Sequence, residues 1–150
     1  MMEIRAAIID DLTAVVRMLA DDFLGQQRER FEVPVPDSYV RAFNEIDSDP
    51  NNELIVAALN GQILGTLQLT FAPSISHQGG KRCTVESVRV DEKFRGRGIG
   101  RKLMLWAIER AREKGCISMP LTTHRDRGDA HRFYESLGFS KSHIGMKLKL

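Results

Sequence analysis

The chain has 150 residues, a net charge of +2 and a hydrophobic fraction of 42%, which suits one globular domain over residues 1–150 and leaves little room for two. Its charged fraction of 28% excludes disordered and fibrous proteins. The two cysteines, Cys83 and Cys116, are too few for a disulfide scaffold, and we see neither a membrane-spanning run nor a signal-peptide pattern. We therefore expect a reduced, cytoplasmic protein.

Basic and acidic residues are distributed unevenly. Residues 1–75 carry 5 basic and 12 acidic side chains, whereas residues 76–150 carry 17 basic and 8 acidic ones. This asymmetry fits a basic surface for phosphates in the second half and an acidic surface for a cation in the first. A scattering of solvated surface charges explains the counts equally well.

Hydrophobic spacing predicts the elements of the first third of the chain. A short strand over Glu3–Ile9 precedes an amphipathic helix over 11–23, whose apolar residues recur at helical intervals. The polar stretch 24–36 ends in Pro34-Val35-Pro36, which breaks any helix. A second helix is predicted over 37–47.

The middle of the chain has the pattern of strands. Glu53–Leu59 and Ile63–Phe71 flank Asn60-Gly61, a pair that tolerates the positive φ angles of a tight hairpin turn. A polar loop over 72–80 separates this hairpin from a further strand over Arg82–Val90.

The last third predicts two more helices and further strands. The helices cover Gly98–Lys114 and 128–137, and the strands cover Ile117–Thr123 and one or two segments within 139–150. The element order predicts an α/β fold, with a mixed, mostly antiparallel sheet of six to seven strands and helices on both of its faces.

The most informative stretch is the glycine-rich turn between the strand Arg82–Val90 and the helix that follows. Glycines let the main chain approach a ligand closely, and the N–H groups and dipole of a helix N-terminus favour an anion. Arginine side chains add bidentate contacts to phosphate oxygens. We therefore predict a pyrophosphate-binding turn, with an ordinary tight turn as the alternative. Its residues are Arg95, Gly96, Arg97, Gly98, Ile99, Gly100 and Arg101.

Two segments resemble the signature motifs of the GNAT N-acetyltransferase superfamily. The first is Arg95-x-x-Gly98-x-Gly100 after the strand end Val88-Arg89-Val90, and the second is Ala130-x-x-Phe133-Tyr134-x-x-x-Gly138-Phe139. They occur in the order and spacing of that family. The resemblance implies a single-domain fold in which two central strands splay apart and leave a V-shaped cleft.

The resemblance also implies acetyl-CoA as co-substrate and roles for individual residues. Main-chain groups of Val88 and Val90 would pair with the pantetheine arm, and the N–H groups of residues 95–101 would hold the pyrophosphate. Tyr134 occupies the family position that protonates the departing thiolate, although a tyrosine on this helical stripe is also typical of a core. No metal is expected, because the histidines and aspartates of residues 124–131 match no metal-site spacing.

Direct acetyl transfer needs a base, because an acceptor ammonium with a pKa near ~10 must lose a proton before it attacks a thioester. Glu86, on the strand that enters the implied cleft, is our candidate, acting through water or by attracting the cation. A structural ion pair with Arg82 is the alternative. The acidic first half favours a small cationic amine as acceptor, and we expect its determinants in residues 21–36 and 72–81.

Other functions stay open at this stage. A non-catalytic CoA-binding module would need the turn but neither Glu86 nor Tyr134. Residues 129–134 and Ser142-His143 also resemble aminoalkylphosphonate acetyltransferases of the same superfamily, which makes that acceptor a further alternative. A nucleic-acid binder is disfavoured because no aromatic platform accompanies the arginines. We expect no membrane partner, and a second copy of the chain is a candidate partner.

Overall fold

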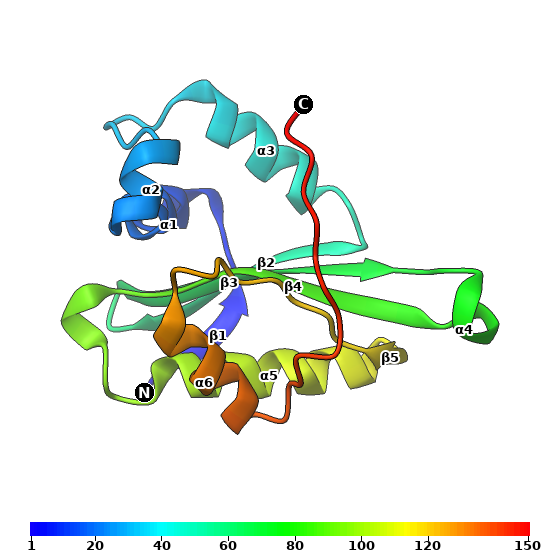
Figure 1. The fold of residues 1–150 in the computed structure, drawn as a ribbon. Helices are drawn as coiled ribbons and strands as arrows, with labels where there is room; N and C mark the ends of the chain where they lie inside the picture. Colours follow the sequence, from blue (N-terminus) through cyan, green and yellow to red (C-terminus); the bar gives the residue numbers. More distant parts are fainter. The chain divides into compact units, whose positions relative to one another are not determined.

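The computed structural model describes residues 1–150, which Figure 1 draws as a ribbon. They form two compact units, Met1–Pro120 and Leu121–Leu150. The strands of the first unit are β1 (Glu3–Ala6), β2 (Asn52–Leu59), β3 (Gln62–Ala72), β4 (Lys81–Val90) and β5 (Cys116–Ser118). Its helices are η1 (Ile9–Asp11), α1 (Leu12–Ala20), α2 (Phe23–Arg28), α3 (Asp37–Asp47), α4 (Ser76–Gly79), η2 (Glu92–Phe94) and α5 (Ile99–Glu113). The second unit contains α6 (Gly128–Ser136). None of these helices combines the length and the apolar character needed to cross a membrane.

The strands of the first unit form one mixed sheet in the order β1-β2-β3-β4-β5. Only β4 and β5 run parallel to each other, so the prediction of a mixed, mostly antiparallel sheet is confirmed. The prediction of six to seven strands is wrong, because the sheet has five. Residues 139–150 form no strand, and β5 ends at Ser118 rather than Thr123. A strand persists only where a neighbouring ladder satisfies its backbone groups. Residues 139–150 have no such ladder, and after Ser118 the contact with β4 is reduced to isolated pairing, such as the hydrogen bond from the Val85 N–H to the Pro120 carbonyl at 3.2 Å.

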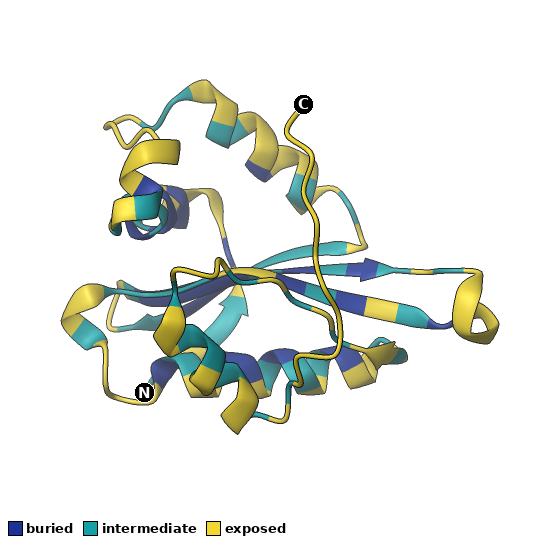
Figure 2. Cartoon of the chain, in the orientation of Figure 1, coloured by how far each residue is buried: buried dark blue, intermediate teal, exposed yellow.

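Helices cover both faces of this sheet, as predicted (Figures 1 and 2). On one face, Val15 and Val16 of α1 and Phe43 of α3 form a buried cluster with Val56 of β2. On the other face, β3 lies so close to α5 that a Cβ on Gly65 would meet the Leu103 side chain at 2.8 Å. Alternation along β3 therefore assigns Gly65 and the buried Leu67, Leu69 and Phe71 to the α5 face.

Helix α2 occupies part of the stretch that the sequence predicts to be polar loop. The Asp22 side chain caps this helix by accepting a hydrogen bond from the Gly25 N–H at 2.7 Å. Gly25 itself packs against α1, where a Cβ would lie 2.0 Å from the Leu19 carbonyl oxygen. The Asp22 cap and the close contact of Gly25 with α1 thus stabilise a helix that hydrophobic spacing does not reveal.

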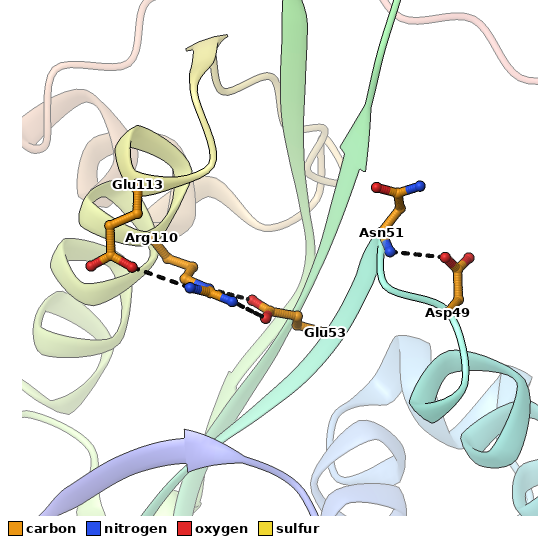
Figure 3. A network of polar contacts seen from close by, with 5 residues as sticks. All are labelled: Asp49, Asn51, Glu53, Arg110 and Glu113. Carbon is orange, nitrogen blue, oxygen red and sulfur yellow. Dashed lines mark hydrogen bonds and ion pairs between the residues drawn. The ribbon is translucent and has the colours of Figure 1, made fainter.

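An ion-pair network attaches α5 to β2 (Figure 3). The Arg110 guanidinium donates to both carboxylate oxygens of Glu53, with distances of 2.6 to 3.2 Å, and to Glu113 at 3.1 Å. The hydrogen bonds from Arg110 to Glu53 raise the pKa of the arginine above its usual value. The Arg110 and Glu53 side chains are 29% and 21% exposed, so water screens this pair only partly.

Replacing Arg110 by Met is expected to lower the free energy of unfolding by about 1–2 kcal/mol, because the Glu53 carboxylate loses its charged partner in a half-buried setting. Arg112→Met is the matched control, since Arg112 pairs with Glu109 on the same helix but both side chains are mostly exposed. Its effect should stay below about 0.5 kcal/mol. Urea unfolding of the two variants measures the difference, and equal losses would contradict the anchoring role of Arg110.

Candidate active site

The pairing of β4 with β5 is short. It comprises only Lys81 with Cys116 and Arg82 with Ser118, followed by a hydrogen bond from the Val85 N–H to the Pro120 carbonyl at 3.2 Å. The other edge of β4 stays paired with β3 as far as Val90. The two parallel strands therefore share a ladder only where β4 begins.

A β-bulge interrupts the pairing of β4 with β3. Glu86 lies opposite Gln68 and Arg89 lies opposite Thr66, so Ser87 and Val88 together oppose a single residue of β3. Ser87 adopts a left-handed conformation with a φ of 56°. Bulges re-aim neighbouring residues and are common beside active sites. Nothing in the sequence signals this bulge, because Ser87 is neither Gly nor Asn.

The bulge decides which backbone groups point away from β3. Before it, the Val85 N–H points to Pro120, on the β5 side. After the bulge, the Asp91 N–H donates to the carbonyl oxygen of Leu64 in β3, so it points to the β3 side. Because alternate residues of a strand direct their N–H groups to opposite edges, those of Val88 and Val90 point to the β5 side.

Glu86 lies on the face of the sheet that α1 and α3 cover. Directly opposite residues of an antiparallel pair share a face, and the partner of Glu86 is Gln68, which alternates with the α5-facing Leu67 and Leu69. The side chain is exposed and forms no ion pair with Arg82. The alternative role of Glu86, an ion pair with Arg82, is therefore not seen in this structure.

The glycine-rich turn leads from β4 through η2 into α5. Gly96 and Gly98 both have a φ of 78°, which a residue with a side chain rarely adopts, and Gly98 is the N-cap of α5. No side chain caps this helix, and the N–H groups of residues 95–101 donate to no carbonyl in the surrounding turns. The turn thus presents a row of backbone donors at a helix N-terminus.

Two arginines of the turn have defined local contacts. The Arg95 Nε donates to the Val90 carbonyl at 3.3 Å, and the Arg97 guanidinium lies 5.5 Å from the centre of the Phe94 ring. Both side chains, like that of Arg101, are exposed. Their charge is therefore available beside the row of N–H groups.

A cavity of about 320 Å³ lies at α1 and α2, within the stretch in which the sequence places the acceptor determinants. It is lined by Arg17, Ala20, Asp21, Gln26, Glu29 and Phe31. Arg17 also reaches Asp91, directly after β4, with 3.7 Å between the charged atoms. The Tyr39 hydroxyl donates to Glu29 at 3.0 Å, and burial raises the pKa of this tyrosine.

A larger cavity, of about 420 Å³, lies on the other face of the sheet, beside α5. Glu53, Trp106 and Arg110 are among its lining residues, and no residue of the predicted site belongs to it. No group of three or more His, Cys, Asp or Glu side chains has an arrangement that could hold a metal ion.

Tyr134 belongs to the second unit, on α6. Its ring makes edge contacts with Phe133 and Phe139, with 5.1 and 5.8 Å between ring centres. Glu86, the end of β4 and the turn 95–101 all belong to the first unit, whereas Tyr134 belongs to the second. Its role as an acid stays a prediction.

Comparison with known proteins gives a consistent picture. The acetyltransferase (GNAT) family profile matches residues 17–139. The aminoalkylphosphonate N-acetyltransferase of Salmonella typhimurium is 35% identical over 98 residues, which are 64% of this chain and 62% of that protein. The glucosamine 6-phosphate N-acetyltransferase of Trypanosoma brucei brucei is 33% identical over 60% of this chain and 59% of that protein. The chain thus spans about three fifths of each of these relatives.

A solved structure extends the comparison over the full chain. The crystal structure described as a transcriptional regulator from Bacillus halodurans C-125 is 54% identical, with a TM-score of 0.97 over 100% of both chains. Its backbone path is therefore shared with all 150 residues.

Proposed function

Because the chain belongs to the acetyltransferase (GNAT) family, we propose that it transfers the acetyl group of acetyl-CoA to the primary amine of a small molecule, by direct attack within a ternary complex. The observation that carries this proposal is the turn 95–101, where a row of N–H groups, two left-handed glycines and three exposed arginines meet at the start of α5. Such a turn fits a diphosphate.

Acetyl-CoA would extend from this turn along β4. Its diphosphate accepts hydrogen bonds from the N–H groups of residues 95–101, and its pantetheine arm pairs with the main chain of Val88 and Val90. The short pairing of β4 with β5 and the outward direction of these two N–H groups support this placement. The splayed strands would form the V-shaped cleft that the family resemblance implies.

The chemistry then needs one proton acceptor and one proton donor. Glu86, through a water molecule, takes a proton from the acceptor ammonium, and the neutral amine attacks the thioester carbonyl. A backbone N–H near Val88 stabilises the oxyanion of the tetrahedral intermediate. The carbon–sulfur bond then breaks as Tyr134 gives its proton to the departing CoA thiolate. The nitrogen of the intermediate passes its remaining extra proton through water to the tyrosinate, which restores Tyr134, and Glu86 returns its proton to solvent, so no acetyl-enzyme forms.

The cavity at α1 and α2 supports the proposed class of acceptor. Asp21 contributes a carboxylate and Phe31 contributes an aromatic surface, which together favour a small organic ammonium. The Glu29 carboxylate is already paired with Arg28 at 3.0 Å and accepts from the Tyr39 hydroxyl, so it contributes less. This cavity and Glu86 belong to the same side of the sheet, and Arg17 joins the cavity to Asp91 after β4. A small cationic amine is therefore the proposed acceptor.

An aminoalkylphosphonate is the second candidate, supported by the 35% identity to the Salmonella typhimurium enzyme. Such an acceptor carries both an ammonium and an anion. Arg17 is the one basic side chain that lines the cavity, and it would contact the phosphonate. Its ion pair with Asp91 competes with that contact, which places this acceptor second.

Release of free CoA thiol from acetyl-CoA tests the proposal. We expect amine-dependent release with at least one member of a panel of polyamines, amino sugars, amino acids, peptide N-termini and aminoalkylphosphonates. Burial raises the pKa of the Cys83 thiol to about 12, so the thiol of this residue adds little background. No release above an enzyme-only control with any amine would contradict the proposed function, and release with phosphonates alone would reverse the order of the two acceptors.

A further inference from the structure

A row of polar side chains lies beside Glu86 on the same face of the sheet. Gln68 of β3 is directly opposite Glu86 of β4. Two residues further along β3, Thr70 is directly opposite Asn52 of β2. Alternate residues of a strand share a face, and so do directly opposite residues of an antiparallel pair. Gln68, Thr70 and Asn52 therefore share the face of Glu86, and none of these three is fully buried.

Asp49 sets the direction of the hydrogen bonds in this row. One of its carboxylate oxygens accepts from the Asn51 N–H, a contact drawn in Figure 3, and the other accepts from the Asn52 side-chain amide, both at 2.8 Å. These two hydrogen bonds lower the pKa of Asp49, so the group stays a carboxylate, which can only accept. The Asn52 amide therefore turns its NH₂ group to Asp49 and its oxygen, Oδ1, away from it.

The same direction continues into Gln68. The Asn52 Oδ1 accepts from the Thr70 hydroxyl at 2.9 Å and from the Gln68 Nε2 at 3.5 Å. Because the NH₂ group of Gln68 is turned to Asn52, its amide oxygen Oε1 is the atom left for a further partner. That oxygen accepts no hydrogen bond from the protein.

Two acceptor groups thus lie on adjacent strands with no protein donor between them. Glu86 is exposed and forms no ion pair, and a carboxylate offers oxygens only. The Cβ atoms of directly opposite strand residues are about 4.5–5.5 Å apart, a separation that two long side chains can bridge through one small group. A primary ammonium carries three N–H donors and one positive charge, so it matches an amide oxygen beside a carboxylate.

We propose that Gln68 is a specificity-determining residue of the acceptor site, whose Oε1 accepts a hydrogen bond from the acceptor ammonium while Glu86 binds the same group. This inference rests on the proposed function, because it gives the proposed base a neighbour that holds the amine. A neutral amide oxygen attracts the cation without taking its proton, which leaves the proton for Glu86. Asn52 is a positioning residue, since it acts on the amine only through Gln68.

Kinetics of the intact enzyme with the best amine of the panel test this assignment. Gln68→Met keeps the size of the side chain but removes the amide, and it should raise the KM for the amine by about 10-fold while the KM for acetyl-CoA stays unchanged. Gln62→Met is the matched control, because it makes the same change at an exposed position of the same strand, and it should alter neither KM. A KM for the amine within twofold of wild type in Gln68→Met, or an equal rise for both substrates, would overturn the proposal.

A double-mutant cycle tests the role of Asn52. Asn52→Ala should raise the KM for the amine by about 2- to 5-fold, because the Gln68 amide can then turn its NH₂ group toward the ammonium. In the Gln68→Met background the same replacement should have no further effect. Full additivity would show that Asn52 does not act through Gln68, against the proposed relay.

Binding without turnover separates this inference from the proposed function. In NMR of the ¹⁵N-labelled protein, propylammonium should shift the side-chain NH₂ resonances of Gln68, which are identified by their loss in Gln68→Met. Propyltrimethylammonium has the same charge but no N–H donor, and it should not shift them. Equal shifts with both probes, or none with either, would overturn the role of Gln68. A failure of every amine to release thiol would instead contradict the proposed function, and the two probes would still decide the ammonium contact.

Discussion

Replacing Glu86 by Gln is expected to lower kcat for acetyl transfer by about 10²- to 10⁴-fold, the range for loss of a positioned general base. The amide keeps the size of the side chain but cannot take the proton from the acceptor ammonium. Because Glu86 is exposed and forms no ion pair, the variant should fold normally and keep its KM for acetyl-CoA. Steady-state kinetics with the best amine of the panel measures the loss.

The pH dependence separates a base from a structural carboxylate. As pH rises toward the pKa of the free amine, near ~10, solvent removes the proton and the deficit of Glu86→Gln should narrow. Glu45→Gln, an exposed substitution on α3, should leave kcat unchanged at every pH. A kcat for Glu86→Gln within twofold of wild type, or a deficit that is constant across the pH range, would show that Glu86 is not the base.

The second large effect is expected at Gly98. Replacing it by Ala should raise the KM for acetyl-CoA by about 10- to 100-fold, as expected when one or two charge-assisted hydrogen bonds are lost. The Cβ would meet nothing within 4 Å in the chain itself, so any steric effect falls on the ligand. The φ of 78° adds a strain of roughly 1–2 kcal/mol to the folded protein.

Gly115 offers a closely matched control for that strain. It follows α5, has a φ of 75°, and would also place its Cβ in open space. Gly115→Ala should lower the stability as much as Gly98→Ala does, while its KM for acetyl-CoA stays at the wild-type value. If both variants raise the KM for acetyl-CoA equally, the loss at Gly98 reports on folding. If neither variant raises it, Gly98 does not contribute to binding the diphosphate.

Local signals in the sequence account for the parts of the fold that could be predicted. Asn60-Gly61 marks the β2–β3 hairpin because only residues that tolerate positive φ fit its turn. The spacing of apolar residues places α1, α3 and α5, and the glycines before α5 mark its N-terminus. These patterns depend on residues close in sequence, so they can be interpreted without the tertiary structure.

Other features depend on contacts that no local pattern encodes. The left-handed Ser87 arises from the register of two strands, and α2 depends on the close approach of Gly25 to α1. Strand signals within 139–150 are present, yet a strand forms only where a ladder partner exists. The site is divided in the same way, since the turn 95–101 is a local motif, whereas the cavity at α1 and α2 is assembled by folding.

Titration of the ¹⁵N-labelled protein with coenzyme A, followed by amide NMR, would show most directly whether the main chain at the N-terminus of α5 binds a diphosphate. We expect the amide resonances of Gly96 and of residues 98–101 to shift together and to saturate with a single binding constant. Those of Gly115 and Lys114, at the far end of the same helix, should stay in place. If the amide resonances at the N-terminus of α5 do not shift while those of other regions do, coenzyme A binds elsewhere and the turn 95–101 is not the diphosphate site.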